Sequence, residues 1–327
     1  MGELWVIGEP TPDGGLARIS AEVATLAREL GVQGDRQVVG IAIGATPDAM
    51  AGELARYVPT VRAIAEPGAA EHAWSAIAAA HVAGLIENAA AEPPDAVLVG
   101  AGPDGRDMAG ALSALTGLGV LTSATAAAWT DAGLSVEMAP FGGKLLTTSG
   151  FTGGRGIVTV RPNVVTAVPA DSPGSVGAEE GVASSLPAVR VLERVSEAGA
   201  AAPIEEAKII VAGGRGVGGA DGFGLVQQLA DELGGVVGAT RAAVDSGWIG
   251  YSQQIGQTGK IVKPELYLAL GISGAIQHKV GMQTAGTIVA VNRDPDAPIA
   301  EFADLLIVGD LFEVGAALLE QLRARSG

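Results

Sequence analysis

Cysteine is absent from the 327 residues of the chain. Its absence excludes disulfides, thiolate metal sites and a cysteine nucleophile. Histidine is scarce, since only His72, His81 and His278 are present and they lie far apart in the sequence. A histidine-rich metal site is therefore not expected, and we predict that the protein holds no metal.

Positive charge is also scarce. The chain has 20 Lys and Arg against 36 Asp and Glu, which gives a formal net charge of −16. Such a charge argues against a nucleic acid or an anionic membrane surface as partner. No apolar run is long enough to cross a bilayer. The first residues lack the basic start and long apolar region of a signal peptide, so we expect a cytoplasmic protein without membrane insertion.

Aromatic residues make up only 4% of the chain, whereas hydrophobic residues of all kinds make up 48% and there are 49 glycines. This composition is typical of a globular α/β protein whose cores are built from Ala, Val, Leu and Ile. One core rarely extends over 327 residues, so we expect two domains.

The first half alternates short apolar strands with helical segments, which predicts a parallel sheet with helices on both faces. The predicted strands there are Leu4–Gly8, Val38–Ile43, Val61–Ala65 and Asp95–Gly100. Later segments with glycine-rich turns between them would add antiparallel strands to that sheet. These segments are Leu121–Thr125, Trp129–Ala139, Lys144–Ser149 and Ile157–Val165.

The end of this half predicts a surface loop at Ala167–Gly181 and a further strand at Val189–Val195. The small residues of Glu197–Pro203 then predict a linker between two domains. We therefore predict two domains, residues 1–203 and 204–327. The second half again alternates strands and helices, so the predicted fold class is α/β with two doubly wound parallel-sheet domains.

Every predicted strand of the second half ends in a glycine loop, a cation or a hydrogen-bonding residue. We call the segment that follows a strand its exit. In chain order these exits are Gly213–Gly216, Thr240–Arg241, Ser273–His278, Asn292 and Asp310. Ligands of open parallel sheets bind at the carboxyl edge of the strands. Five such exits in one domain indicate a large polar ligand that lies across this edge.

The types of residue at these positions indicate which chemical groups the ligand carries. Arg215 and Arg241 suit phosphate or developing negative charge, and the loop at Ser273 could offer backbone N–H groups to a pyrophosphate. Asn292 and Asp310 could hydrogen-bond a ribose or an adenine. Gln257, Thr258 and His278 could bond a heteroaromatic ring. This pattern is typical of a dinucleotide with a redox-active ring, although the chain lacks a correctly spaced GxGxxG fingerprint.

At these residues the second half closely resembles the alpha subunit of electron transfer flavoproteins. The resemblance extends almost continuously from Lys208 to the C-terminus, whereas the first half is similar mainly in layout. The segments that carry it are GGRG at 213–216, TRAAVDSGW at 240–248, QIGQTGK at 254–260, PELYLALGISGAIQHKVGM at 264–282, TIVAVNRDPDAPI at 287–299 and ADLLIVGDLF at 303–312.

The resemblance implies that the C-terminal domain is a Rossmann-like unit that binds FAD non-covalently. It also implies a heterodimer with a beta subunit, which the N-terminal domain would contact and which would hold AMP or a second flavin. Such a pair carries electrons from acyl-CoA or other flavin dehydrogenases to a quinone oxidoreductase or another acceptor. The chain would then be an electron carrier and not an enzyme, and whether the pair bifurcates electrons stays open.

By position, the resemblance assigns three residues to redox tuning. Thr258 would bond the central-ring nitrogen of the flavin, His278 a carbonyl of its pyrimidine ring, and Arg241 would be the cation beside the ring. No catalytic acid, base or nucleophile is expected. The remaining expected FAD contacts are Arg215, Thr240, Ile255, Gly256, Gln257, Ser273, Gly274, Ala275, Ile276, Gln277, Asn292, Asp310 and Leu311.

Structural roles compete with these assignments. His278 could be a structural histidine, Arg215 and Arg241 could be surface or ion-pair cations, Asn292 could cap a turn, and Asp310 could cap the last helix. For the whole chain, two alternatives are a nucleotide-dependent oxidoreductase that acts alone and a scaffold subunit that has lost its flavin. The missing GxGxxG fingerprint and the absence of a catalytic acid–base pair argue against the first alternative. The second is disfavoured by an intact set of polar residues: Arg215, Arg241, Thr258, Ser273 and His278.

Overall fold

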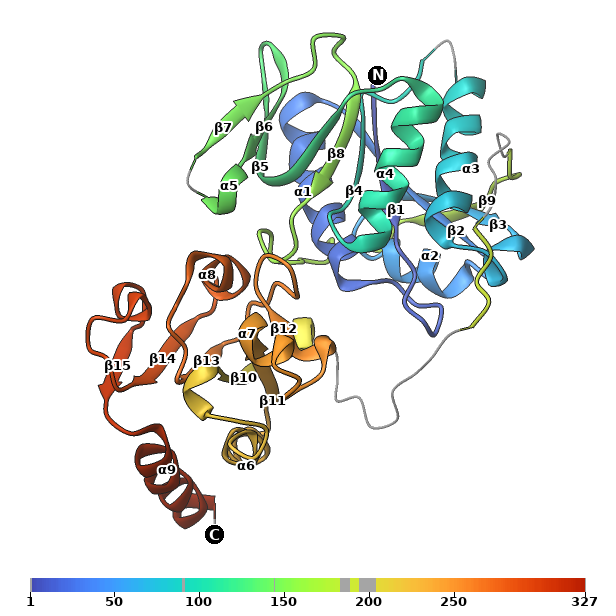
Figure 1. Ribbon diagram of the computed structural model, residues 1–327. Coiled ribbons are helices and arrows are strands. Elements are labelled where there is room, and N and C mark those ends of the chain that lie inside the picture. The colour runs from blue at the N-terminus through green and yellow to red at the C-terminus, as the bar shows by residue number, and fades with distance from the viewer. Residues whose placement is uncertain (1, 90–91, 144, 183–188, 194–203, 327) are drawn as a thin grey trace. The chain divides into compact units, whose positions relative to one another are not determined.

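The computed structural model describes residues 2–89, 92–143, 145–182, 189–193 and 204–326. The chain forms two compact units, Met1–Val195 and Ser196–Gly327 (Figure 1). The predicted linker Glu197–Pro203 lies outside the described residues, so the boundary at residue 203 stays a prediction.

The N-terminal unit is built on one sheet with the strand order β7-β6-β5-β8-β4-β1-β2-β3-β9. Its central strands pair in parallel, whereas β5–β6 and β6–β7 pair antiparallel, which confirms the predicted fold class for this half. The strands are β1 (Glu3–Gly8), β2 (Gln37–Gly44), β3 (Thr60–Ala65), β4 (Ala96–Gly100), β5 (Val120–Thr130), β6 (Gly133–Met138), β7 (Thr147–Ser149), β8 (Gly156–Val160) and β9 (Ser175–Ala178).

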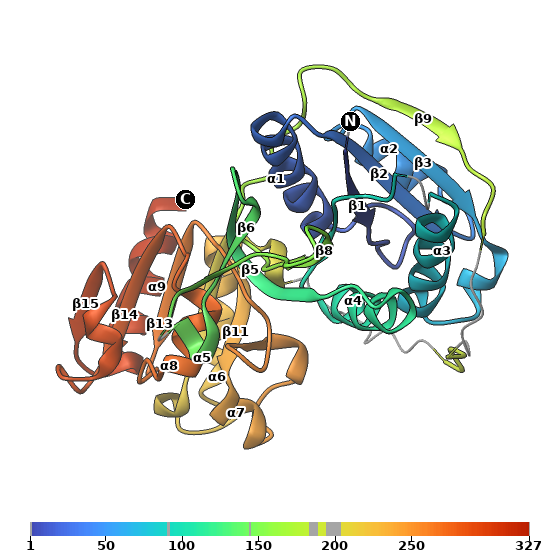
Figure 2. The same cartoon turned by 90° about the horizontal axis from the view of Figure 1, so that it is seen from above.

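Three details of the sequence prediction are wrong. The segment Ile157–Val165 was expected to add an antiparallel strand, but β8 within it pairs in parallel with both β4 and β5. The segment Ala167–Gly181 is not only a loop, because β9 within it pairs in parallel with β3 at the edge of the sheet (Figure 2). In Val189–Val195, the described residues 189–193 form a single bridge between His72 and Arg190 instead of a strand. The latter two segments owe their pairing to residues far away in the sequence, which local patterns do not reveal.

Alternating side chains of each central strand face two different cores. On β1, Leu4 and Val6 belong to one buried cluster, and Trp5 and Ile7 to the other. The first cluster includes side chains of α1 and α2, and the second those of α3 and α4, so helices cover both faces. The helices of this unit are α1 (Arg18–Gly34), α2 (Asp48–Leu54), α3 (Trp74–Asn88), α4 (Pro103–Thr116) and the short α5 (Pro140–Gly143).

The C-terminal unit has an entirely parallel sheet with the strand order β12-β11-β10-β13-β14-β15. The chain winds outward from β10 through β11 to β12, and then outward on the other side from β13 to β15. This leaves a topological switch point between β10 and β13. The strands are β10 (Ile209–Gly213), β11 (Val236–Thr240), β12 (Gln254–Ile255), β13 (Leu266–Leu270), β14 (Thr287–Asn292) and β15 (Leu305–Val308).

Helices also cover both faces of this second sheet. One core contains Val226 and Leu229 of α6 and Leu319 of α9, and the other contains Met282 of α8 and Ile299. The helices are α6 (Phe223–Leu233), α7 (Arg241–Asp245), α8 (Ile276–Met282) and α9 (Leu311–Ser326). Among the described residues of the whole chain, no helix is long and apolar enough to cross a membrane.

One carboxyl group in the N-terminal unit is buried without a cation beside it among the described residues. Glu9 follows β1, is only 6% exposed, and its Oε1 has no hydrogen-bond partner among the described residues. Burial raises the pKa of this carboxyl to about 7, and the nearby negative charge of Asp104 adds to the rise. The folded protein therefore holds a proton on Glu9 more tightly than the unfolded chain does.

This raised pKa predicts a loss of stability between about pH 4.5 and 7, because the stabilisation from protonated Glu9 is full below the unfolded pKa and disappears above the folded one. The shift corresponds to about 3 kcal/mol. Glu9→Gln should therefore remove most of this pH dependence and stabilise the protein at pH 8. Denaturant unfolding across this range tests it, and equal slopes for both proteins would contradict it.

Candidate functional site

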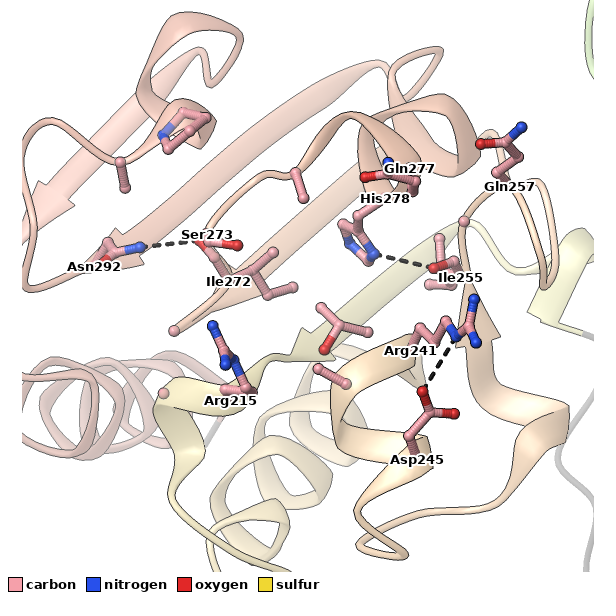
Figure 3. Close-up of a pocket in the computed structure, with 18 of the residues that line it drawn as sticks. Arg215, Arg241, Asp245, Ile255, Gln257, Ile272, Ser273, Gln277, His278 and Asn292 are labelled. Carbon is pink, nitrogen blue, oxygen red and sulfur yellow. Dashed lines mark hydrogen bonds and ion pairs between the residues drawn. The ribbon is translucent and has the colours of Figure 1, made fainter. Parts of the chain in front are cut away.

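A cavity of about 640 Å³ opens at the carboxyl edge of the C-terminal sheet (Figure 3). The exits of β10, β11, β13 and β14 all contribute to its lining, as expected for the switch point of a doubly wound sheet. Its size is that of a site for a cofactor or other small molecule. The lining residues that the sequence predicted are Arg215, Thr240, Arg241, Ile255, Gly256, Gln257, Thr258, Ser273, Ala275, Gln277, His278 and Asn292.

Glycines let the segments that follow β10 and β13 lie close together, where both line this cavity. A Cβ atom on Gly216 would lie 2.6 Å from Cα of Gly271, and one on Gly214 would lie 2.4 Å from the carbonyl oxygen of Gly271. Gly271 also has a φ of +62°, which disfavours any other residue. The backbones after β10 and β13 can therefore meet only because these positions have no side chain.

Two arginines from neighbouring strand exits supply positive charge at the cavity. Arg215 follows β10 and has no carboxylate partner among the described residues. Arg241 opens α7, where its Nε lies 3.1 Å from Oδ2 of Asp245, and both side chains are largely exposed. Asp245 was not among the predicted site residues, although its i,i+4 spacing from Arg241 on a helix could have indicated this pair.

Two side chains hold Thr258 in place in the loop after β12 by hydrogen bonds. The buried Gln254 donates from Nε2 to both the carbonyl oxygen and Oγ1 of Thr258, each at 3.1 Å. The Tyr251 hydroxyl donates to the same carbonyl at 2.8 Å. Because the Thr258 hydroxyl accepts from Gln254, its own proton is free to be donated into the cavity.

His278 is held on both sides of its ring. Nδ1 lies 3.0 Å from the carbonyl oxygen of Ile255 and Nε2 lies 2.8 Å from the Tyr267 hydroxyl. A carbonyl only accepts, so Nδ1 carries the proton and Nε2 accepts from Tyr267. Burial lowers the pKa of His278 to about 4 and so favours the neutral ring.

This geometry gives His278 the structural role that competed with its expected ligand contact. Both ring nitrogens are used within the chain, and they join α8 to β12 and β13. A bond from His278 to a ligand carbonyl would require Nε2 to exchange Tyr267 for the ligand. That expected bond stays a prediction.

The cavity also contains a hydroxyl without a partner. Thr240 ends β11 and lines the cavity, and its buried Oγ1 has no hydrogen-bond partner among the described residues. An unsatisfied buried hydroxyl costs about 1–3 kcal/mol. This hydroxyl is therefore a site where a polar ligand atom would relieve a cost already present in the fold.

Asn292 and Asp310 have the local roles that competed with ligand binding. Asn292 donates from Nδ2 to the carbonyl of Ile272 at 2.9 Å and accepts from the amide of Asp294 at 3.1 Å, although it still lines the cavity. Asp310 accepts from the amide of Phe312 at the start of α9 and pairs with Arg293.

Four predicted contacts do not line the cavity, and their contact with a ligand stays a prediction: Gly274, Ile276, Asp310 and Leu311. Eight lining residues were not predicted, because most of them are small or apolar and enter the cavity through neighbouring backbone. They are Gly216, Ala242, Asp245, Gly271, Ile272, Asp294, Ala297 and Pro298.

Comparisons with known proteins identify both halves of the chain. Residues 4–189 match the electron transfer flavoprotein domain, and residues 203–283 match the electron transfer flavoprotein FAD-binding domain. The chain is 43% identical to electron transfer flavoprotein subunit alpha of Mycobacterium tuberculosis over 100% of both chains. It is 38% identical to that of Thermoanaerobacterium thermosaccharolyticum over 98% of both.

Two further similarities are more restricted. Over 37% of this chain and 34% of the relative, it is 53% identical to the mitochondrial alpha subunit of Dictyostelium discoideum. A solved thiamine diphosphate-dependent 4-hydroxybenzoylformate decarboxylase of Rhodococcus jostii matches 98% of this chain and 59% of its own with a TM-score of 0.25 and 11% identity. That likeness is too weak to support any argument.

The residues at the cavity fit FAD. The unpartnered Thr240 hydroxyl offers a donor, Arg215 offers a cation for a pyrophosphate, and the glycines after β10 and β13 allow a ligand to approach the backbone. Gln257 and Thr258 add further polar groups at the rim of the cavity. The donors are therefore those that a dinucleotide with a polar ring requires.

The burial of His278 predicts that its ring does not titrate between pH 5 and 8, because burial lowers its pKa to about 4. Tyr267→Phe removes the donor to Nε2, so it should raise the His278 pKa, by roughly one unit for a lost hydrogen bond. NMR of the imidazole resonances measures both values. Tyr251→Phe is the matched control and should leave His278 unchanged, whereas equal shifts in both variants would contradict the assignment.

Proposed function

We infer the function of this chain from its family: it belongs to the alpha subunits of electron transfer flavoproteins. We propose that it holds FAD at the carboxyl edge of its C-terminal sheet and passes electrons to and from that flavin as one subunit of a two-subunit carrier. Acyl-CoA or other flavin dehydrogenases would supply the electrons, and a quinone oxidoreductase or another acceptor would take them.

The observation that carries this proposal is the convergence of polar groups on one cavity in the unit that matches the FAD-binding domain. Thr240, Thr258 and Ser273 reach it from three separate segments of the chain, and the buried Thr240 hydroxyl has no partner among the described residues. A scaffold subunit without flavin would have no reason to retain this hydroxyl at a cost in stability.

Bound FAD supplies the one- and two-electron redox chemistry, so the protein has to bind, orient and tune it. Thr258 would donate its hydroxyl proton to the central ring, because Gln254 already occupies the acceptor side of that oxygen. Arg241 would stabilise negative charge near the ring. His278 would keep the loop at Ile255 in place as a neutral ring, since its Nδ1 donates to that carbonyl.

Electron transfer of this kind needs no acid–base pair or nucleophile in the protein. The titratable groups that line the cavity are Arg215, Arg241, Asp245, His278 and Asp294. His278 is the one that titrates nearest to neutral pH in its free form, and burial favours its neutral state. This supports a carrier over a nucleotide-dependent oxidoreductase that acts alone.

We also propose that the N-terminal unit contacts a beta subunit and that the pair is cytoplasmic. Co-expression with the beta subunit followed by anaerobic reductive titration tests the proposal as a whole. We expect a yellow heterodimer with at least one FAD, in the alpha chain, that accepts electrons from a dehydrogenase. A colourless pair would contradict the proposal, and a second flavin that titrates separately would indicate a bifurcating pair.

Thr240→Val should weaken FAD binding by about 1 kcal/mol, roughly fivefold in Kd, because it removes one hydrogen bond to the cofactor. The stability of the apoprotein should stay the same or rise, since the hydroxyl that is lost has no partner among the described residues. Thr240→Ser keeps the hydroxyl and is the control. FAD titration together with apoprotein unfolding separates the two effects, and unchanged FAD affinity in the valine variant would refute this role.

Arg241 and Asp245 predict opposite shifts of the flavin reduction potential. Arg241→Ala removes a cation and should lower the potential, by roughly 30–60 mV for a three- to tenfold change in a one-electron equilibrium. Asp245→Asn removes the anion paired with that cation and should raise the potential. Spectroelectrochemical titration measures both, with Arg241→Lys as the control that keeps the charge. Shifts of the same sign in both variants would contradict the electrostatic role.

A further inference from the structure

An ion pair outside the cavity fastens the end of the loop that carries Thr258. Nζ of Lys260 lies 2.6 Å from Oε1 of Glu205. Lys260 ends the loop at residues 256–260, which follows β12. Glu205 belongs to a 3-10 turn, η2 (Ile204–Glu206), with which the described part of the C-terminal unit begins. The pair therefore joins two segments that are far apart in the sequence, and neither residue lines the cavity.

The backbone of Lys260 closes this loop. Its amide donates to the carbonyl oxygen of Gln254 at 2.7 Å, and its carbonyl oxygen accepts from the amide of Gly256 at 3.1 Å. Gln254 in turn donates from Nε2 to the carbonyl oxygen and Oγ1 of Thr258. A displacement of Lys260 would therefore reach Thr258 through a single intervening residue, Gln254.

Apolar packing fixes η2 beside the same loop. Ile204 is buried and belongs to one cluster with Ile255 and Val262, which flank the loop. Glu205 is thus held next to a residue that is anchored in the core. An ion pair costs less when one partner is already ordered, because less side-chain entropy is lost on pairing.

The Lys260–Glu205 pair is better shielded from water than the Lys208–Glu265 pair of the same unit. The side chains of Lys260 and Glu205 are 39% and 34% exposed, whereas those of Lys208 and Glu265 are 82% and 74% exposed and lie 3.5 Å apart. Water and salt screen exposed pairs, and partly buried pairs are screened much less. The Lys208 pair precedes β10 and β13, at the amino ends of these strands, so it is a matched control.

We propose that Lys260 and Glu205 are positioning residues for the redox-active ring, because their ion pair fixes the loop from which Thr258 donates. Both act through Gln254 on the direction of the Thr258 hydroxyl. This role rests on the function proposed above, in which Thr258 faces the ring of bound FAD. Reduction adds negative charge to that ring and strengthens a hydrogen bond that the ring accepts. A displaced Thr258 should therefore make the first electron harder to accept.

Lys260→Met and Glu205→Gln each break the pair and keep most of the side-chain volume. In the FAD-loaded, full-length chain with its beta subunit, both should lower the first one-electron potential by roughly 40 mV, which is about a fivefold change in the one-electron equilibrium. The two substitutions change the charge in opposite directions, so a direct electrostatic effect would give shifts of opposite sign. Spectroelectrochemical titration measures the potentials, and the control Lys208→Met should leave them unchanged.

Further variants separate positioning from a general loss of structure. Glu205→Lys combined with Lys260→Glu re-forms the pair with its charges exchanged, so the potential should return towards the wild-type value. In a Thr258→Val background, breaking the pair should change the potential no further. In the apoprotein, hydrogen exchange at the amides of Gly256 and Lys260 should become roughly threefold faster when the pair is broken.

The role of the pair is refuted if both single variants keep the wild-type potential, if their shifts have opposite signs, or if the charge-exchanged variant restores nothing. A wild-type chain that takes up no FAD would contradict the function proposed above, which is a separate failure. Even then, unchanged amide exchange in the two single variants of the apoprotein would show that the pair does not hold the loop.

Discussion

The close approach of the backbones after β10 and β13 is the constraint on which the C-terminal site depends. Chain winding in two directions from these strands opens the carboxyl edge, and Gly214, Gly216 and Gly271 let the two exits meet. Every polar group at the cavity is placed relative to this junction. A side chain at any of these glycines would separate the exits and displace Arg215 from the loop that carries Ser273.

Around this junction the site is ordered mainly by bonds within the protein. Gln254 and Tyr251 fix Thr258, and Tyr267 and the Ile255 carbonyl fix His278. These bonds define which groups can donate into the cavity before any cofactor binds. The charged side chains differ, because Arg241 and Asp245 are exposed and act on the site through their charge.

Much of this arrangement could be predicted from the sequence. Parallel strands have polar exits at one edge, so Arg215, Thr240 and Ser273 were predicted together from order along the chain alone. The partners of His278 could not be predicted, since Tyr267 reads as a core residue of its strand and the Ile255 carbonyl has no sequence signature. The strand β9 was missed for a similar reason, because its pairing with β3 depends on which segments meet in space. The Arg241–Asp245 pair is local, and its i,i+4 spacing could have indicated it.

The central claim is that FAD lies across the carboxyl edge at the β10/β13 switch point. Hydrogen–deuterium exchange of the apoprotein with and without FAD tests it most directly, since bound cofactor protects the amides it covers. The account predicts protection in residues 214–218, 240–245, 254–258 and 271–278, with no change around Glu9. Protection at the amino-terminal ends of the strands of this sheet, or between β1 and β4 of the N-terminal unit in place of these segments, would contradict it.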